Sequence, residues 1–438
     1  MVLVRSGVWH IGTGVAPACV TALAGAVLLG SLAVAQDVAP TSARFTVAEA
    51  LRALESDHPA LAAARAQVTA AAGDAVAIGL WDNPAISGAR NTGVGASASD
   101  TPTEHDWSIS QNLDVFKVRA AARQAARLER DATEADYQGL LASLRLGVER
   151  AFIAVVAARQ RRQLEEDTLG RFEEAFRIVQ ARVQAGAEPR YDGTRMALGL
   201  ASVRADAADA RADQTTARTA LDVAVGPGAR TLVGEPAYAL FEERSVPALA
   251  ELMTLAASRP DLAAARLRAQ SAERAVIAAR RGVWPSFSVS AGESEVFSTP
   301  RDFAWNLGVS VTVPLFNRGQ GTRAAARARA AVAAGTASAI DASTRQALTG
   351  AYSVMTIRRQ AVAAFRDAGS TIDDTMLREA QAAYQGGAIE ILDLIDAYSS
   401  YHDTRARAID LATSARGAEL DTIETATVPG ATIGGSGD

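Results

Sequence analysis

The feature that most constrains the fold of this chain is an internal repeat. Residues 58–65 read HPALAAAR and residues 259–266 read RPDLAAAR, 201 positions later. Three further matches follow in the same order and close to the same offset: WDNPAIS (81–87) with VWPSFSVS (283–290), LDVFKVRAAAR (113–123) with PLFNRGQGTRAAAR (314–327), and VQAGAEPRYD (183–192) with YQGGAIEILD (384–393). Chance similarity between alanine-rich helices could produce one match but hardly four in order, so the chain is a tandem duplication.

Each repeat begins with a helical pattern followed by two strand patterns. A helix of roughly 35 residues is expected over 46–80 and over 245–282, ending before a proline. The clearest strand is FAWNLGVSVTV (303–313), in which apolar residues take every second position. Strict alternation is typical of a strand with two different faces. The partner strand and the two first-half equivalents are the shorter segments FSVS (287–290), WSISQNL (107–113) and AISGAR (85–90).

A very long helical hairpin completes each repeat. Helix is predicted almost without interruption over about 117–185 and 322–385, and nearly 70 residues span roughly 100 Å. Return helices are expected over 189–225, with Pro189 in the first turn, and over 389–424. The turns fall at Gly186 and at the pair Gly386 and Gly387. The fold class is therefore mainly α with a small β part.

The N-terminal segment has the pattern of a secretory signal peptide. An apolar run at 18–34 ends at Ala33-Val34-Ala35, an A-x-A cleavage site. A membrane anchor is the alternative, but a run of about 17 residues is short for one. The single cysteine, Cys19, lacks the leucine that usually precedes a lipidated cysteine, so no lipid anchor is expected. These features predict an exported protein without disulfides.

The repeat and the terminal segments divide the chain into five parts. We expect a signal peptide (1–35), a first repeat (36–225), a Gly- and Pro-rich linker or girdle segment (226–247), a second repeat (248–426) and a disordered tail (427–438).

Several classes of function are disfavoured by composition and spacing. The net charge is −5, so the chain has no basic footprint for nucleic acid. Three histidines follow the signal peptide, His58, His105 and His402, and none has metal-ligand spacing to another. His105 lies between two acids and could touch a metal, but an ordinary loop is the simpler interpretation. No nucleophile–base pair is recognisable. We expect neither an enzyme nor a bound metal or cofactor.

The strands raise a problem of closure. Two β-hairpins give four strands, which cannot form a closed barrel, and an open sheet edge cannot face lipid. Three copies would supply twelve strands, within the range of outer-membrane barrels. The sequence therefore predicts a homotrimer with a 12-stranded outer-membrane β-barrel and a periplasmic α-barrel of long hairpins. Trp107, Phe303 and Trp305 suit an aromatic girdle at the membrane interface, with packing between strands as the alternative.

This combination resembles the outer-membrane factor family, the TolC-type channels of tripartite efflux pumps, over about 45–425. In this family the hairpin tip is a glycine followed six residues later by an acid, as in GAEPRYD (186–192) and GAIEILD (387–393). VPLFNRGQG (313–321) and LWDNPAIS (80–87) are similar to the heavy-metal branch, whose members pair with cobalt–zinc–cadmium exporters.

The resemblance implies roles for the tip residues. The turns would dock a periplasmic adaptor through Gly186, Ala187, Pro189, Gly386, Gly387 and Ala388. Asp393 and Asp396 would form a constricting acidic ring that attracts cations, with Asp192 and Tyr384 beside it. The alternative is that these acids only favour a helix N-terminus. Ile389 stands where members with a well-described closed state have an arginine, and Arg190 or Arg195 are possible substitutes.

The function implied is a passive exit duct in the cell outer membrane that extends into the periplasm. Its expected partners are two further copies of the chain, a periplasmic adaptor (membrane fusion protein), an inner-membrane RND transporter and outer-membrane lipid. The cargo is either heavy-metal cations or drugs and other organic solutes. A periplasmic coiled-coil adaptor or scaffold is a weaker alternative, because the alternation at 303–313 argues for a strand.

Overall fold

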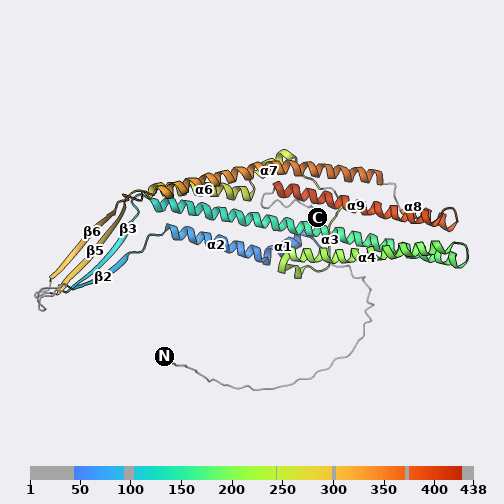
Figure 1. The fold of residues 1–438 in the computed structure, drawn as a ribbon, viewed down its shortest axis with the longest axis horizontal. Coiled ribbons are helices and arrows are strands. Elements are labelled where there is room, and N and C mark those ends of the chain that lie inside the picture. The colour runs from blue at the N-terminus through green and yellow to red at the C-terminus, as the bar shows by residue number, and fades with distance from the viewer. Residues whose placement is uncertain (1–43, 93–102, 243, 298–301, 370–373, 427–438) are drawn as a thin grey trace, which may run out of the picture. The chain divides into compact units, whose positions relative to one another are not determined.

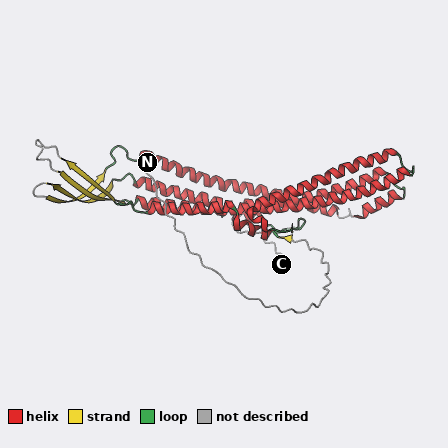
Figure 2. Cartoon of the chain, turned by 90° about the horizontal axis from the view of Figure 1, so that it is seen from below, coloured by secondary structure: helices red, strands yellow, loops and turns green. Residues whose placement is uncertain are grey.

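Long helices dominate the structure, a computed structural model that describes residues 44–92, 103–242, 244–297, 302–369 and 374–426. The predicted signal peptide with Cys19 and the predicted tail lie outside these residues. The described residues all belong to one unit. Figure 2 shows that helices make up most of the described chain, with a sheet of strands at one end and a short strand beside the helices.

The two halves contain the same succession of elements. The first half comprises α1 (Val47–Asp57), α2 (Pro59–Gly79), β2 (Ala85–Thr92), β3 (Thr103–Leu113), α3 (Val118–Gln184) and α4 (Arg190–Val225). The second comprises α5 (Leu249–Ala256), α6 (Pro260–Arg281), β5 (Ser286–Phe297), β6 (Asp302–Thr312), α7 (Gln320–Gly369), α8 (Asp374–Gln385) and α9 (Ile391–Ala426). Each half therefore contains one hairpin of strands followed by one hairpin of helices, as the repeat predicts.

The first predicted helix of each half is in fact two helices, so the prediction of a single helix there was wrong. His58 and Arg259 have extended backbone, with ψ of 122° and 140°, and each precedes a proline. The proline ring excludes the helical conformation for the residue before it, but proline itself fits the first turn of a new helix. Pro59 and Pro260 therefore start α2 and α6. The His58 ring accepts a hydrogen bond from the Ala60 amide at 3.2 Å and caps α2.

The four long strands form one antiparallel sheet in the order β2-β3-β5-β6. The two hairpins join where β3 pairs with β5, so strands from the two halves lie side by side. The strand predicted at 303–313 is confirmed as β6. β5 is much longer than the predicted FSVS, because the polar run after Ser290 stays paired with both β3 and β6.

The two faces of this sheet differ in character. Residues directly opposite one another in the register share a face. One face carries rows such as Ile86, Ile109, Ala291 and Leu307. The other carries small and polar residues, such as Ser87, Ser108, Gly292 and Asn306. Most of the large apolar side chains are exposed in the single chain.

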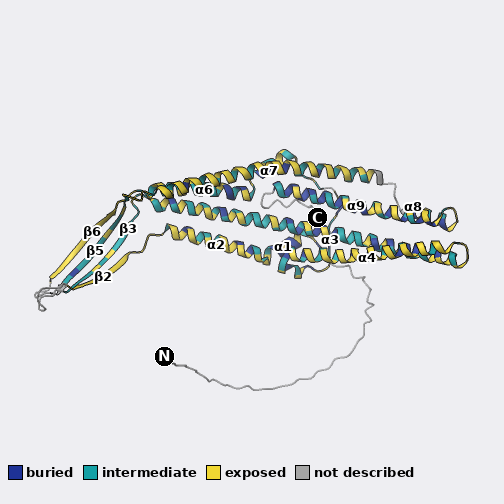
Figure 3. Ribbon diagram, in the orientation of Figure 1, coloured by how far each residue is buried: buried dark blue, intermediate teal, exposed yellow. Residues whose placement is uncertain are grey.

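α3 joins the sheet to the first helical turn and is the longest element, with 67 residues. It packs against α2, α4, α6 and α9 (Figure 1). In the second half the corresponding path is α7 and α8, and residues 370–373 between them lie outside the described residues. In Figure 3 buried, intermediate and exposed residues alternate along the long helices.

Two apolar clusters lie at different levels of the long helices. The first gathers side chains of α1, α3 and α4 with the segment between the halves, among them Phe45, Leu54, Phe152, Leu221 and Leu240. The second lies near the helical turns and includes Phe172, Met196, Leu377, Tyr384 and Tyr398. Each cluster takes residues from both halves of the chain, since α9 contributes to both.

The segment between the halves, predicted as a linker or girdle, packs against the helices. A 3₁₀ helix, η1 (Gly226–Thr231), lies on α1, and a Cβ at Gly228 would come within 2.3 Å of the Ala53 carbonyl oxygen. The short strand β4 (Glu235–Pro236) pairs in parallel with β1 (Arg44–Phe45). Arg218 of α4 donates hydrogen bonds to the carbonyl oxygens of Leu232 and Gly234.

Among the described residues, every helix is either too short or too polar to qualify as a membrane span.

Candidate functional site: the helical tips

The turn between α3 and α4 is closed by a glycine in the left-handed region. Gly186 has φ of 73°. Its amide donates to the Val183 carbonyl at 3.1 Å, and the Ala187 amide donates to the Arg182 carbonyl at 2.9 Å. This pair of bonds is the Schellman arrangement, which satisfies the last carbonyl groups of a helix. Glycine is favoured because a Cβ in this conformation meets the following carbonyl oxygen.

The turn after α8 repeats the same geometry. Gly387 has φ of 75°, its amide donates to the Tyr384 carbonyl at 3.0 Å, and the Ala388 amide donates to the Ala383 carbonyl at 2.8 Å. Gly386 is not in the left-handed region, so only Gly387 is required by the backbone. Ala187 and Ala388 are both exposed. The residues predicted to dock an adaptor thus form two matching, solvent-facing turns.

Pro189 lies just before α4, at its N-cap, whereas the sequence prediction places it in the first turn. Its φ of −64° and ψ of 148° are those of a residue about to enter a helix. The missing amide hydrogen costs nothing at this position, because the first amides of a helix have no partner within it.

Asp393 has a role in its own helix. Its carboxylate accepts a hydrogen bond at 3.0 Å from the amide of Glu390, the residue before α9, so it satisfies a helix N-terminus. This is the role that the sequence analysis gave as the alternative to an acidic ring. Asp396 lies three residues further on, exposed, and makes no hydrogen bond to any described residue. The helix-terminus alternative therefore accounts for Asp393 and leaves Asp396 without a structural task.

The corresponding acid of the first turn, Asp192, is half-buried in the first turn of α4. Its amide donates to the Pro189 carbonyl at 3.1 Å. Its negative charge acts on the phenol of Tyr384 and raises the pKa of that group, after the larger effects of burial and of Glu188. Asp192 and Tyr384, which come from different halves, are thus electrostatic neighbours.

Tyr384 is the most enclosed of the predicted tip residues, with 1% of its surface exposed. Arg182, in the last turn of α3, donates a hydrogen bond to the Tyr384 carbonyl oxygen at 2.9 Å. The same guanidinium lies 5.0 Å from the centre of the Tyr384 ring and 3.2 Å from the Glu188 carboxylate. Arg182 therefore links the two helical hairpins through its contacts with the ring and the carbonyl oxygen of Tyr384, while its ion pair with Glu188 lies within the first hairpin.

Sequence reasoning missed Arg182 and named Arg190 and Arg195 as substitutes for the absent arginine. Arg195 instead approaches the Tyr191 hydroxyl of its own helix at 3.5 Å. Among the described residues neither arginine makes a side-chain contact with Tyr384. The available signal was the position of Arg182, four residues before Gly186 in the last turn of α3, where an arginine favours the helix C-terminus.

A second group of polar residues lies in a cleft of about 400 Å³ between α3, α4 and α9. His402 bonds through Nε2 to Glu165 at 2.8 Å and through Nδ1 to Asp403 at 3.1 Å. Asp206 of α4 also lines the cleft. Burial lowers the pKa of His402, but the bonds to Glu165 and then Asp403 outweigh burial, and the pKa is raised. Since Glu165 is buried on α3, this pair also joins the two hairpins.

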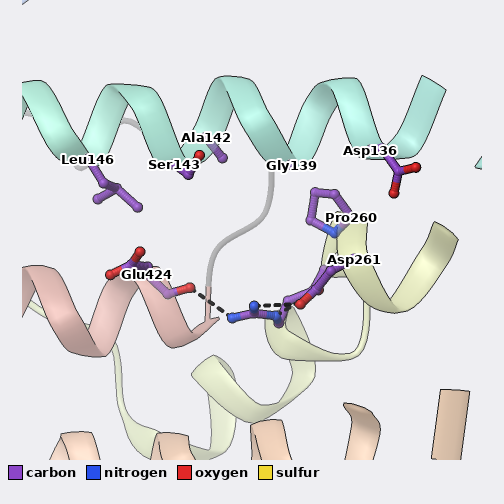
Figure 4. A pocket seen from close by; sticks show the side chains of 9 residues that line it. Asp136, Gly139, Ala142, Ser143, Leu146, Pro260, Asp261 and Glu424 are labelled. Atoms are coloured by element: carbon purple, nitrogen blue, oxygen red, sulfur yellow. Dashed lines mark hydrogen bonds and ion pairs between the residues drawn. The ribbon is translucent and has the colours of Figure 1, made fainter. Parts of the chain in front are cut away.

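A further cleft lies where α3, α6 and α9 meet (Figure 4). Arg259 donates hydrogen bonds to the carbonyl oxygens of Glu424 and Thr425, at 2.8 Å and 2.6 Å, and pairs with Asp261 at 2.7 Å. Its guanidinium thus satisfies the C-terminal carbonyls of α9. The cleft is a structural joint. Within the described ranges no group of three or more His, Cys, Asp or Glu residues could hold a metal ion.

The predicted girdle residues lie on the sheet. Trp107 of β3 and Trp305 of β6 are both opposite Glu293 of β5, so they share one row, and Phe303 lies in the next row. All three are exposed in the single chain. Their contact with lipid stays a prediction.

Comparison with known proteins identifies the fold and the repeat. The model of one protein family, described as "Outer membrane efflux protein", matches residues 50–227 and again 252–422. The pyoverdine export outer membrane protein OpmQ of Pseudomonas aeruginosa is 27% identical over 246 residues, which are 52% of this chain and 50% of OpmQ. The cobalt-zinc-cadmium resistance protein CzcC of Cupriavidus metallidurans is 24% identical over 295 residues, 67% of this chain and 70% of CzcC.

Among solved structures, the crystal structure of CusC matches with a TM-score of 0.74 at 20% identity, covering 87% of this chain and 91% of that one. The chain spans about half the length of OpmQ and about seven tenths of CzcC. The predicted resemblance to the outer-membrane factors is confirmed.

The link between the hairpins at Tyr384 can be tested by replacing Arg182. Arg182→Ala removes the hydrogen bond to the Tyr384 carbonyl and the contact with its ring, a loss of about 1–2 kcal/mol. The amides around Gly387 should then exchange with solvent roughly 5- to 30-fold faster, measured by hydrogen–deuterium exchange and mass spectrometry. Arg195→Ala is the matched control and should leave these amides unchanged. Equal acceleration by both substitutions would contradict the assigned link.

The His402 cleft predicts a pH dependence of stability. Because the folded pKa of His402 is raised above its ordinary value of about 6.5, the stabilisation is complete below that value and is lost as pH rises through the folded pKa. The thermal midpoint of the wild type should therefore exceed that of His402→Gln at low pH, and this difference should shrink as the pH rises from about 6.5 through the folded pKa. Asp403→Asn, which keeps the bond to Glu165, should retain most of the dependence. A constant difference at all pH values would refute the assignment.

Proposed function

The chain belongs to the outer membrane efflux protein family, and on this premise we propose that it is the outer-membrane exit duct of a tripartite efflux system. One observation carries the proposal. An amphipathic sheet lies at one end of the long helices, and two matched helical turns, after α3 and after α8, lie at the opposite end. A chain with this arrangement can contact a membrane at one end and a periplasmic partner at the other.

The sheet supports a trimer as the working state. β2 and β6 each pair with one neighbour among the described strands, so both edges of the sheet can take another strand. Unpaired backbone groups are expensive in hydrocarbon, and three copies of the four-stranded sheet make a closed 12-stranded barrel. The apolar face would turn to lipid and the serine-rich face to the water-filled lumen.

The tips support docking of a periplasmic adaptor and control of the opening. Ala187 and Ala388 expose small surfaces beside Gly186 and Gly387, which a helical hairpin of an adaptor can approach closely. In a trimer, Asp396 from three chains would gather carboxylates near the entrance, with Asp393 one turn closer to the tip. The contacts of Arg182 with Tyr384 would hold each pair of hairpins together in the state described here. An inner-membrane RND transporter would drive transport.

We propose heavy-metal cations as the cargo. Support comes from the similarity to the cobalt-zinc-cadmium resistance protein CzcC and from the exposed carboxylates at the tips. The similarity to the pyoverdine export protein OpmQ, at slightly higher identity over a shorter stretch, favours a second candidate, export of organic solutes. A passive duct can serve either cargo, because the transporter selects it.

Growth of a deletion strain tests the proposal. We expect sensitivity to zinc, cobalt, cadmium, nickel, copper or silver, restored by the wild-type gene, and no change with dyes and antibiotics. Sensitivity to organic compounds alone would support the second candidate. Heat-resistant trimers in the outer-membrane fraction are expected in both cases, and a soluble monomer would contradict the duct.

The acidic entrance predicts a block by cations. In planar bilayers, the wild-type channel should be blocked from the periplasmic side by multivalent cations. Asp396→Asn removes three carboxylates per trimer, each of which contributes about 1 kcal/mol to attraction in water, so the blocking concentration should rise roughly ten- to hundredfold. Asp213→Asn, an exposed acid further along α4, is the control. A similar shift in both variants would exclude a ring at Asp396.

A further inference from the structure

The tryptophans of this chain occupy two levels around the sheet. The chain has five tryptophans, and one of them, Trp9, lies in the predicted signal peptide. Trp107 and Trp305 lie in one row of the sheet, on either side of Glu293. Trp81 and Trp284 lie at the other level, four and two residues before the first residues of β2 and β5. All four are largely exposed, at 62%, 64%, 61% and 80% for Trp81, Trp107, Trp284 and Trp305.

Between these two levels, the face of the sheet that carries Trp107 and Trp305 has no charged residue. On this face, the rows between the Trp107 row and the helices contain only uncharged residues. They are Ile86, Ile109, Gln111, Leu113, Phe287, Val289, Ala291, Leu307, Val309 and Val311. Charged residues on this face begin in the Trp107 row itself, with Glu293, and continue in the next row with Arg90 and Glu295. The tryptophans thus bound an apolar band on both sides.

The height of the band fits the hydrocarbon layer of an outer membrane. Nine residues separate Trp284 from the row of Glu293, seven of them along β5, and at about 3.4 Å per residue they span at most about 31 Å. Strands of membrane barrels tilt by about 35–45°, which reduces the height to about 23 Å, close to the apolar band of about 25 Å in such barrels.

Cations are concentrated at the level of Trp81 and Trp284. The four segments that connect strands to helices, 80–84, 113–119, 280–285 and 313–323, contain six cations, Lys117, Arg119, Arg280, Arg281, Arg318 and Arg323, and two acids, Asp82 and Asp114. Their sum is +4 in a chain with a net charge of −5. We call these four segments the collar.

Contacts within the collar bring its aromatic and cationic groups together. The Arg119 guanidinium lies 5.1 Å from the centre of the Trp81 ring and pairs with Asp82 at 3.2 Å. Phe116 stacks on Trp284, with 5.3 Å between ring centres and 23° between planes. Lys117 and Arg318 are exposed, and neither has an ion pair with a described acid. Their charges are available to a partner.

We propose that the collar binds the anionic phospholipid headgroups of the membrane leaflet that faces the long helices. Tryptophan rings prefer the boundary between acyl chains and headgroups, where one edge is apolar and the N–H is hydrated. Exposed cations beside them attract lipid phosphates. Phe316, which also belongs to the collar and is exposed, adds apolar surface at the same level. The inference rests on the proposed membrane duct and assigns its position along the bilayer normal.

Two double variants separate the tryptophan levels. Trp107→Phe with Trp305→Phe leaves only the collar pair, and Trp81→Phe with Trp284→Phe leaves only the sheet pair. The mature protein is reconstituted into phosphatidylethanolamine–phosphatidylglycerol vesicles whose acyl chains carry bromine near the headgroup or near the bilayer centre. Fluorescence of both pairs should be quenched more strongly by the shallow bromine than by the deep one.

The choice of lipid is tested by energy transfer from the collar tryptophans to headgroup-labelled lipids. Phosphatidylglycerol should be enriched around the collar relative to phosphatidylcholine. Lys117→Gln with Arg318→Gln should reduce this preference roughly tenfold, whereas Arg90→Gln, at the opposite level, should not. Equal transfer to both lipids in the wild type would overturn the assignment to anionic headgroups.

The outcomes distinguish this inference from the proposed function. If the vesicles conduct and the sheet pair is quenched while the collar pair is not, a second copy of the chain covers the collar, and the lipid proposal is wrong while the duct stands. If neither pair is quenched and the vesicles do not conduct, the duct itself is refuted.

Discussion

The continuity of α3 is the constraint on which the other features depend. Its 67 residues form one hydrogen-bonded helix between the sheet and the first turn, about 100 Å at 1.5 Å per residue. Such a helix cannot stabilise itself by local propensity alone, so it requires apolar partners along its length. It finds them in α2, α4, α6 and α9, which come from both halves of the duplicated chain. The repeat thus supplies the packing that a single half lacks.

The two helical turns show how the duplicated halves become different. Both end in the same glycine geometry, at Gly186 and Gly387, because an abrupt reversal of a helix favours the same backbone conformation in each. The side chains around them are not equivalent. The first half contributes Arg182 and the second contributes Tyr384, and the contact between them exists only because the two hairpins lie together. The two turns therefore share their backbone geometry, but the contact between Arg182 and Tyr384 has no counterpart with the halves exchanged.

Much of this organisation can be predicted from residues close together in the chain. Period-two alternation placed β6 within one residue, and the glycine-to-acid spacing located both tips. The errors also have local causes. Pro59 and Pro260 were interpreted as part of longer helices, although proline forces its predecessor out of the helical conformation. β5 was predicted too short, because its polar residues are ordered by two neighbouring strands rather than by their own pattern.

Sequence by itself determined the duplication, the element types and the tip glycines, since each follows from spacing or from the preference of one residue. Only the tertiary structure decided which arginine meets Tyr384 and that His402 pairs with Glu165. Glu165 and His402 lie 237 positions apart, and no local pattern encodes their contact. Such pairs arise from the packing of one hairpin against the other, which depends on every apolar contact along the helices.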